Sequence, residues 1–303
     1  VIHCPDLPLN VSRSALQNDG FVKKISDYIT KKVADKLSGM CKTDREAYEK
    51  YWDDISPFIK FGCLKDDKFE EKMKDYILFK NLDKKYLTLQ DCLEENKEKH
   101  ENTIYYVTDE KEQSQYINMF KEAGLDAVML GHNIDSPFIG QLEQKNEGLK
   151  FLRIDADVTD TFKEEVAEES AEAFKADTEK LTETFKKALG NDKLEIKVEK
   201  LKNADLASMI TVSEESRRMQ DMMKMYNMYG MDPSMFGGSG QVLILNANNN
   251  LVQYVLEHGE GENTAKICEQ LYDLALLSHG SLTPERMTNF IARTNEIMGM
   301  LAK

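Results

Sequence analysis

The chain has 303 residues, of which 41% are hydrophobic and 31% are charged, a composition typical of a globular protein with a buried core. Its formal charge of −14, with no basic stripe in the sequence, argues against a nucleic-acid surface. No apolar run approaches the roughly eighteen residues of a membrane span, so we expect no membrane partner. The chain starts without methionine and its first residues resemble the middle of a fold, so we expect a fragment of a longer protein.

The first forty residues are predicted to be helical after a short extended start. Pro8 favours extended backbone before it, and Ser12 is a suitable N-cap for a short helix that runs to Gln17. Apolar residues spaced one turn apart predict a second helix over Phe21–Leu37, which we expect to break at Gly39.

Three more short helices are predicted before residue 80. Thr43 and Glu46 have the spacing of a capping box and start the first of them. Pro57 is expected to begin or kink the next helix, and Gly62 to stop it. The third covers Phe69–Phe79, so the segment before the centre of the chain is mainly helical.

Strands and helices alternate in the centre of the chain. Predicted strands cover Ile104–Val107, Ala127–Leu130 and Leu149–Ile154, and predicted helices cover Gln113–Ala123 and Asp135–Lys145. Such alternation implies right-handed parallel crossovers and a small three-layer α/β/α unit. The predicted fold class is therefore α/β at the centre and α+β over the whole chain.

A dense set of carboxylates over Asp155–Glu183 marks a change of character. Acidic runs of this kind are typical of a solvated helix face or a segment between domains. We therefore expect three parts: residues 1–80, residues 81–160 and residues 161–303.

The last part is predicted to mix strands with helices. Its elements are a helix over Leu181–Leu189 closed by Gly190, strands over Leu194–Val198, Ala207–Val212 and Gln241–Asn246, and two final helices over Asn263–Ser278 and Thr283–Leu301. We expect the first two strands to pair. Both final helices carry apolar residues every three or four positions, and packing against a two-fold copy is the simplest way to bury them.

Arg13 lies at the start of the first helix, and Gln17, one turn further on, points the same way. The helix dipole disfavours a cation at that position unless an anion is supplied. The alternative is an ordinary surface ion pair between Arg13 and Asp6 or Asp19.

The segment Met219–Met235 holds seven of the fifteen methionines. One helical stripe cannot bury all of them, and flexible methionine side chains suit surfaces that adapt to several partners. We therefore weigh a contact surface against a plain hydrophobic core.

Other features argue against chemistry carried by this chain alone. The five cysteines are scattered without a C-x-x-C pair, which indicates reduced thiols and cytoplasm and argues against a thiolate metal site. Gly237–Gly240 precedes a strand, so no phosphate-binding loop is supported. His132 and Asp135 follow the second central strand, where a ligand, metal or acid/base role competes with an ordinary surface pair. We expect no metal and no enzyme activity from the chain alone.

Several motifs resemble the heat shock protein 90 (Hsp90) family of chaperones, in its bacterial form, in order along essentially the whole chain. They are Leu7–Arg13 with Leu16–Gln17, Phe58–Cys63, Ile104–Thr108, Ile134–Asp135 with Gln141–Leu142, and Leu271–Leu277. The resemblance implies the later part of the family's middle segment followed by its C-terminal dimerisation domain. It also implies an ATP-dependent, homodimeric, cytoplasmic bacterial chaperone whose ATP and Mg²⁺ are held by a domain outside this chain.

The resemblance assigns roles to particular residues. Arg13 and Gln17 match the pair that contacts the γ-phosphate of ATP. Client proteins would be contacted by Met219, Met222, Met223, Tyr226 and Met235 of the methionine-rich segment, and by Phe138, because Pro137 stands near the usual place of an aromatic residue. The dimer interface would include Leu271, Leu274, Phe290, Ile291, Ile297, Met298 and Leu301. An Hsp70-type cochaperone system is a further candidate partner, and a dimeric scaffold without chaperone activity is the alternative function.

Overall fold

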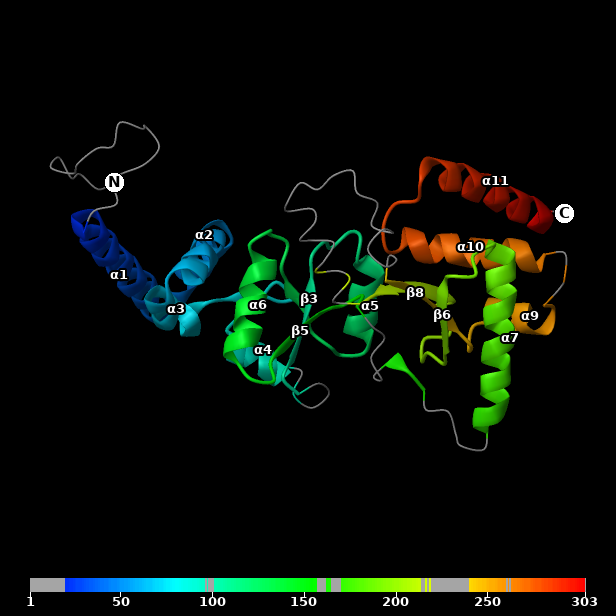
Figure 1. Ribbon diagram of the computed structural model, residues 1–303, viewed down its shortest axis with the longest axis horizontal. Coiled ribbons are helices and arrows are strands. Elements are labelled where there is room, and N and C mark those ends of the chain that lie inside the picture. Colours follow the sequence, from blue (N-terminus) through cyan, green and yellow to red (C-terminus); the bar gives the residue numbers. More distant parts are fainter. Residues whose placement is uncertain are drawn as a thin grey trace. The chain divides into compact units, whose positions relative to one another are not determined.

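The computed structural model describes two compact units (Figure 1). The described residues are 20–95, 97, 101–156, 162–164, 170–213, 216, 218, 240–259, 261 and 263–302. The first unit holds those of Val1–Glu94 and Ile134–Gly148, and the second those of Glu95–Asn133 and Leu149–Lys303. The second unit runs across residue 160, and the expected three-part division stays a prediction. Among the described helices, none combines the length and apolar character that crossing a membrane requires.

Helices dominate the first unit. Its elements are α1 (Gly20–Thr43), α2 (Arg45–Lys65), α3 (Asp67–Met73), the 3₁₀ turn η1 (Lys74–Tyr76), the antiparallel pair β1 (Phe79–Lys80) and β2 (Tyr86–Leu87), α6 (Asp135–Lys145), and α4 (Leu89–Glu95), whose last residue falls in the second unit. The predicted helix over Phe69–Phe79 is wrong at its end, because α3 stops at Met73 and Phe79 lies in a strand.

The helix ends expected at Gly39 and Gly62 are also wrong. For Pro57, the expected helix start is wrong, and the alternative of a kink stays a prediction. α1 continues through Gly39 to Thr43, and Cys41 in its last turn is buried, with 8% of its surface exposed. α2 runs through both Pro57 and Gly62, because buried side chains on either side of Pro57 keep one face of the helix in the core. A Cβ atom at Gly62 would lie 2.8 Å from the Phe69 ring, so this glycine permits close packing instead of ending the helix.

The cap between the two longest helices differs from the expected one. Asp44 is the N-cap of α2, and its carboxylate accepts a hydrogen bond from the Ala47 amide at 3.1 Å. The Thr43 hydroxyl instead donates to the Gly39 carbonyl at 2.9 Å, as the last residue of α1. The positive end of the helix dipole also stabilises a carboxylate at the N-cap.

The predicted α/β core is confirmed in the second unit. β3 (Thr103–Val107) lies between β4 (Val128–Met129) and β5 (Lys150–Arg153), and both neighbours run parallel to it. α5 (Ser114–Glu122) connects β3 to β4, while α6, which precedes β5, is counted with the first unit.

A second three-stranded sheet forms the C-terminal part of the second unit. It contains β6 (Glu195–Glu199), β8 (Gln241–Asn246) and β7 (Ser208–Val212), in that order. The expected pairing of β6 with β7 is wrong, because β8 lies between them, parallel to β6 and antiparallel to β7. The strand that completes the sheet begins at Gln241, 29 residues after the end of β7 at Val212, and local sequence cannot indicate such a pairing.

Three helices build a core with this sheet. They are α7 (Ala171–Leu189), α9 (Asn250–Glu257) and α10 (Thr264–Leu277), and the last helix is α11 (Pro284–Leu301). The core includes Phe185 from α7, Leu243 from β8 and Leu271 from α10, each at most 2% exposed. Gly190, with φ of 60°, ends α7 in the left-handed conformation expected of a C-terminal glycine.

Side-chain and backbone contacts join the two sheets within this unit. The Tyr116 hydroxyl of α5 donates to the Ile210 carbonyl of β7, and the Val212 amide donates to the Asp155 carbonyl at 3.1 Å. The Asp155 carboxylate forms a bidentate pair with Arg153, both distances being 2.5 Å, and lies 3.3 Å from His279 in the loop before α11. The strand β7 is therefore attached directly to the central α/β core.

Candidate interaction surface of the C-terminal hairpin

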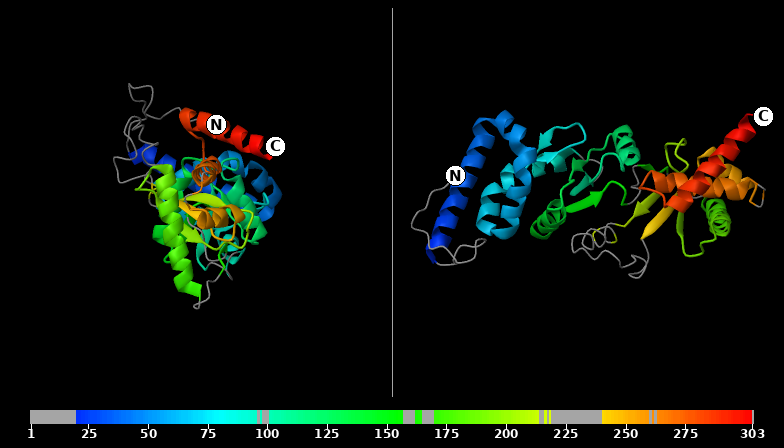
Figure 2. Two further views of the ribbon diagram at one scale, coloured as in Figure 1. Left: turned by 90° about the vertical axis from the view of Figure 1, so that its right-hand side faces the viewer. Right: turned by 90° about the horizontal axis from the view of Figure 1, so that it is seen from above.

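The helix α11 packs against α10 through its polar side. Figure 2 shows α11, in red, crossing α10, in orange. Among the described side chains of α11, only Arg293 is buried, with 8% of its surface exposed. A helix of a monomeric globular protein usually turns its apolar side to the protein, so this packing is the reverse of the common arrangement.

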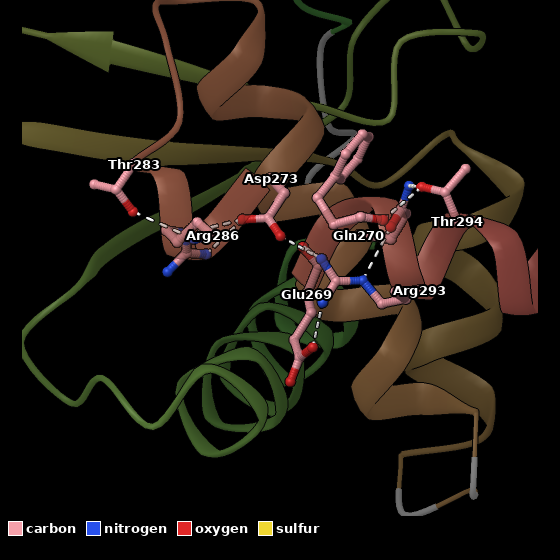
Figure 3. Close-up of polar contacts among 8 residues, drawn as sticks. Glu269, Gln270, Asp273, Thr283, Arg286, Arg293 and Thr294 are labelled. Carbon is pink, nitrogen blue, oxygen red and sulfur yellow. Dashed lines mark hydrogen bonds and ion pairs between the residues drawn. The ribbon is translucent and has the colours of Figure 1, made fainter. Parts of the chain in front are cut away.

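Asp273 of α10 is the centre of the contact (Figure 3). It is 2% exposed, and its carboxylate accepts hydrogen bonds from Arg286 Nε at 3.0 Å and Arg286 Nη2 at 2.6 Å. The other carboxylate oxygen accepts from Arg293 Nη2. One buried carboxylate therefore holds two guanidinium groups of the neighbouring helix.

The remaining donors of Arg293 also bind residues of α10. Nε donates to Gln270 Oε1 at 2.9 Å, and Nη1 donates to a Glu269 carboxylate oxygen. Gln270 in turn donates to the Thr294 hydroxyl at 3.1 Å. Two carboxylates thus balance two guanidinium groups, and the hydrogen bonds offset the cost of removing these charges from water.

The cavity beside this network, about 570 Å³ in volume, does not offer free charge to a ligand. Its charged lining groups include Asp273, Arg286 and Arg293, which pair with one another, and Lys266, which pairs with Glu296 at 2.7 Å. The lining is therefore best understood as the polar contact between the two helices.

Apolar side chains of the hairpin point to solvent instead. Ile291 and Met298 of α11 are 52% and 53% exposed, and Leu274 of α10 is 46% exposed. Phe290 and Ile297 are half-buried. An apolar surface of this kind indicates contact with another chain.

The prediction that Leu271 belongs to the dimer interface is wrong. It is 2% exposed and packs in the core of its own unit, and its carbonyl accepts a hydrogen bond from the Ser208 hydroxyl at 2.8 Å. It lies on the side of α10 that faces the sheet, whereas Leu274, three residues later, faces solvent. Leu301 lies in α11, but its side chain is outside the described residues.

Among the predicted site residues outside the hairpin, Phe138 lies within the described part of the chain. Phe138 is 1% exposed and lies beneath Lys60, so its ring is not available at the surface, which corrects the expected client contact. The remaining predicted site residues lie outside the described part of the chain: Arg13, Gln17, Met219, Met222, Met223, Tyr226 and Met235.

The structure gives no support to a site built from Asp135. Its carboxylate is 2.5 Å from Lys60 Nζ and both side chains are buried, so Asp135 joins α6 to α2. His132 is exposed. Within the described residues, no group of three or more His, Cys, Asp and Glu side chains is arranged to hold a metal ion.

An exposed aromatic stripe follows one side of α2 in the first unit. Tyr51, Phe58 and Phe61 are 49%, 78% and 53% exposed. Spacings of seven and three residues place them along one side of the helix. Lysines lie beside two of the rings: Lys50 Nζ is 5.9 Å from the centre of the Tyr51 ring, and Lys65 Nζ is 5.7 Å from the centre of the Phe61 ring. This aromatic stripe is a second surface whose composition suits contact with other proteins.

The polar network was missed by sequence reasoning that followed only apolar spacing. Arg286 and Arg293 are seven residues apart, as are the apolar Ile291 and Met298. Two carboxylates, Glu269 and Asp273, are four residues apart on the preceding helix. Charges of opposite sign with helical spacing on two consecutive helices were the available signal.

Comparison with known proteins supplies the family context. The family described as "Hsp90 protein" matches residues 1–302. A chaperone protein HtpG of Bacteroides thetaiotaomicron is 38% identical over 273 residues, which cover 86% of this chain and 39% of that protein. HtpG of Porphyromonas gingivalis is 35% identical, covering 87% and 39%, and HtpG of Borrelia garinii subsp. bavariensis is 29% identical, covering 96% and 47%. The chain thus spans less than half the length of these relatives.

Proposed function

The chain belongs to the Hsp90 family, and from this membership we propose that it provides the dimerisation surface, and part of the client contact, of an ATP-dependent homodimeric chaperone. The observation that supports dimerisation is the reversed packing of α11, with Arg293 inward and Ile291 and Met298 outward. A second copy would remove these apolar side chains from water, which is worth about 25 cal/mol per Å². Two-fold symmetry lets one surface serve both copies, giving four packed helices.

Sedimentation velocity over a range of concentrations tests this surface. We expect Ile291→Asp and Met298→Asp each to raise the dimer Kd at least about tenfold, because a charge cannot be buried in an apolar contact. Leu251→Asp is the matched control, since Leu251 is an apolar residue of α9 that is 47% exposed. A wild-type chain that stays monomeric at every concentration would refute dimerisation.

The nucleotide role concerns Arg13 and Gln17. We propose that they contact the γ-phosphate of ATP, held with Mg²⁺ by a domain outside this chain, because a guanidinium supplies planar, permanently charged donors where negative charge must be stabilised. The test is the ATPase activity of the complete protein with Arg13→Ala. We expect a large loss, and no loss with Lys23→Ala, an exposed lysine of α1.

Client binding is assigned to the methionine-rich segment, supported by a composition that one helical stripe cannot bury. Met222→Ser with Met223→Ser should weaken the suppression of aggregation of an unfolding model protein, measured by light scattering. The alternative function is a dimeric scaffold, which would not suppress aggregation even as the wild-type chain. A bacterial cytoplasmic location and an Hsp70-type cochaperone complete the proposal, and binding of a purified Hsp70-type chaperone would test the latter.

A further inference from the structure

We propose that Asp273 is a positioning residue for the hairpin surface: by holding Arg286 and Arg293, it sets the rotation of α11 on α10 and directs Ile291 and Met298 outward. This inference rests on the proposed dimerisation surface. It adds a role for a buried polar residue that does not itself belong to the apolar contact.

The two arginines define one side of α11. Residues seven apart on a helix lie within about 20° of each other around the axis. Both guanidinium groups meet one carboxylate, with Arg286 Nη2 at 2.6 Å from Asp273 Oδ1 and Arg293 Nη2 bonded to Oδ2. Two attachments one above the other oppose rotation of the helix about its own axis.

The outward direction of the apolar side chains follows from this attachment. Ile291 precedes Arg293 by two residues, which places the two side chains about 160° apart around the helix. Met298 is seven residues after Ile291 and therefore lies on the same side as Ile291. As long as Arg293 points to Asp273, both apolar side chains point away from α10, in agreement with their exposure of 52% and 53%.

Other contacts between the two helices are less able to set this rotation. Lys266 and Glu296 pair at 2.7 Å, but their side chains are 32% and 49% exposed, so water and salt compete with the pair. The Glu269 carboxylate, which also binds Arg293, is 43% exposed. Asp273, whose side chain is 3% exposed, is the anion of this contact that water competes with least.

The central variant is Asp273→Asn, which keeps the shape but removes the charge that both guanidinium groups need. We expect its dimer Kd to rise at least about tenfold, because one partner of a buried charge pair is lost. Asp273→Glu keeps a carboxylate and is expected to stay within about threefold of the wild type. Lys266→Ala is the matched control, because it removes a more exposed ion pair between the same two helices. Its dimer Kd is also expected to stay within about threefold of the wild type.

Rotation of α11 is measured directly with spin labels at Ala265 of α10 and Asn295 of α11, both exposed positions. Cysteines at these two positions are labelled in a chain with Cys4→Ser, since Cys41, Cys63, Cys92 and Cys268 are buried. The doubly labelled chain is mixed with an excess of unlabelled chain, so that labels on two copies of one dimer do not contribute. We then expect one narrow distance distribution in the wild type and in Lys266→Ala. In Asp273→Asn we expect a shifted or broadened distribution, which a merely stabilising contact would not produce in the folded chain.

The outcomes separate this inference from the proposed function. If Asp273→Asn leaves the label distance or the dimer Kd unchanged, the inference is wrong even though dimerisation stands. If the wild type is monomeric, dimerisation fails, and the distance in the monomer still decides whether Asp273 sets the rotation of α11. Should Asp273→Asn not fold, Arg286→Gln replaces it, because Arg286 is 41% exposed and its loss leaves the buried pair intact. A smaller shift is then expected, and no shift overturns the inference.

Discussion

In the first unit, Lys60 and Asp135 form a sealed ion pair, closed off from solvent, whereas in the second unit Asp273 belongs to a network that reaches the surface. The side chains of Lys60 and Asp135 are 6% and 7% exposed, with 2.5 Å between Nζ and Oδ1. The rings of Phe79 and Phe138 lie 6.0 and 5.8 Å from Lys60 Nζ. Water is therefore kept from both charges of this pair.

The network around Asp273 is open at two ends. The Arg286 side chain is 41% exposed and the Glu269 side chain is 43% exposed, although Asp273 between them is buried. In the sealed pair, loss of one charge leaves the opposite charge buried, whereas a network with exposed members can lose one and compensate with water. The sealed pair therefore mainly holds α6 on α2, whereas the open network sets the rotation of α11 on α10.

Breaking the sealed pair should have the largest effect. We expect Asp135→Ala to lower the free energy of unfolding of the first unit by about 3–5 kcal/mol, because Lys60 would remain buried without its partner. Urea unfolding followed by the fluorescence of Trp52 measures it, since this is the only tryptophan, is 3% exposed and lies in α2.

The control for this prediction removes both charges. Lys60→Met with Asp135→Leu should be neutral or more stable than the wild type, because no charge is left buried. A loss below about 1 kcal/mol for Asp135→Ala would show that water reaches this pair, as it reaches exposed ion pairs.

The packing next to the sealed pair gives the second prediction. Gly62→Ala should cost about 1–3 kcal/mol, because the new Cβ would lie 2.8 Å from the Phe69 ring and force α3 to move. Gly39→Ala is the matched change in α1, where no atom lies within 4 Å of the added Cβ. It should raise stability by up to about 1 kcal/mol through helix propensity. Equal effects of the two changes on the Trp52 transition would contradict this account.

Removing one exposed member of the network should have a smaller effect. We expect Arg286→Ala to lower the stability of the second unit by about 1 kcal/mol, since Asp273 keeps Arg293 and only an exposed pair and the contact with the Tyr272 ring are lost. The loss should shrink further in high salt, which screens exposed charges. Circular dichroism during urea unfolding measures it, and a loss as large as that of Asp135→Ala would remove the distinction between the two contacts.

The smallest effect is expected for thiol modification, because the buried cysteines of the folded wild type should hardly react. Burial raises the pKa of Cys63 in α2 and of Cys268 in α10 to about 12, so both thiols stay protonated at pH 8. Iodoacetamide should leave both unmodified in the folded chain, as mass spectrometry can establish. Asp135→Ala should accelerate modification of Cys63 only, and Asp273→Asn that of Cys268 only. Acceleration of both thiols by either variant would mean that the two units open together.

Local sequence predicted elements well where one strong signal acted alone. The three central strands, the final two helices and the end of α7 at Gly190 follow from apolar runs, helical spacing and a C-terminal glycine. It failed in α1 and α2, where breaking residues were given too much weight. Burial of Trp52 and Cys63 on one side of α2 outweighs the local cost of Pro57, and only the packed fold shows that balance.

For the candidate surface, the sequence by itself determined that two amphipathic helices close the chain and which of their residues are apolar. The tertiary structure decided that Leu271 turns inward, that Ile291 and Met298 turn outward, and that an arginine occupies the buried side of α11. Helical spacing shows which residues share one side of a helix, but it does not show which element packs against that side. Burial is a property of two packed elements, and here one buried carboxylate on α10 made the polar side of α11 the one that faces the protein.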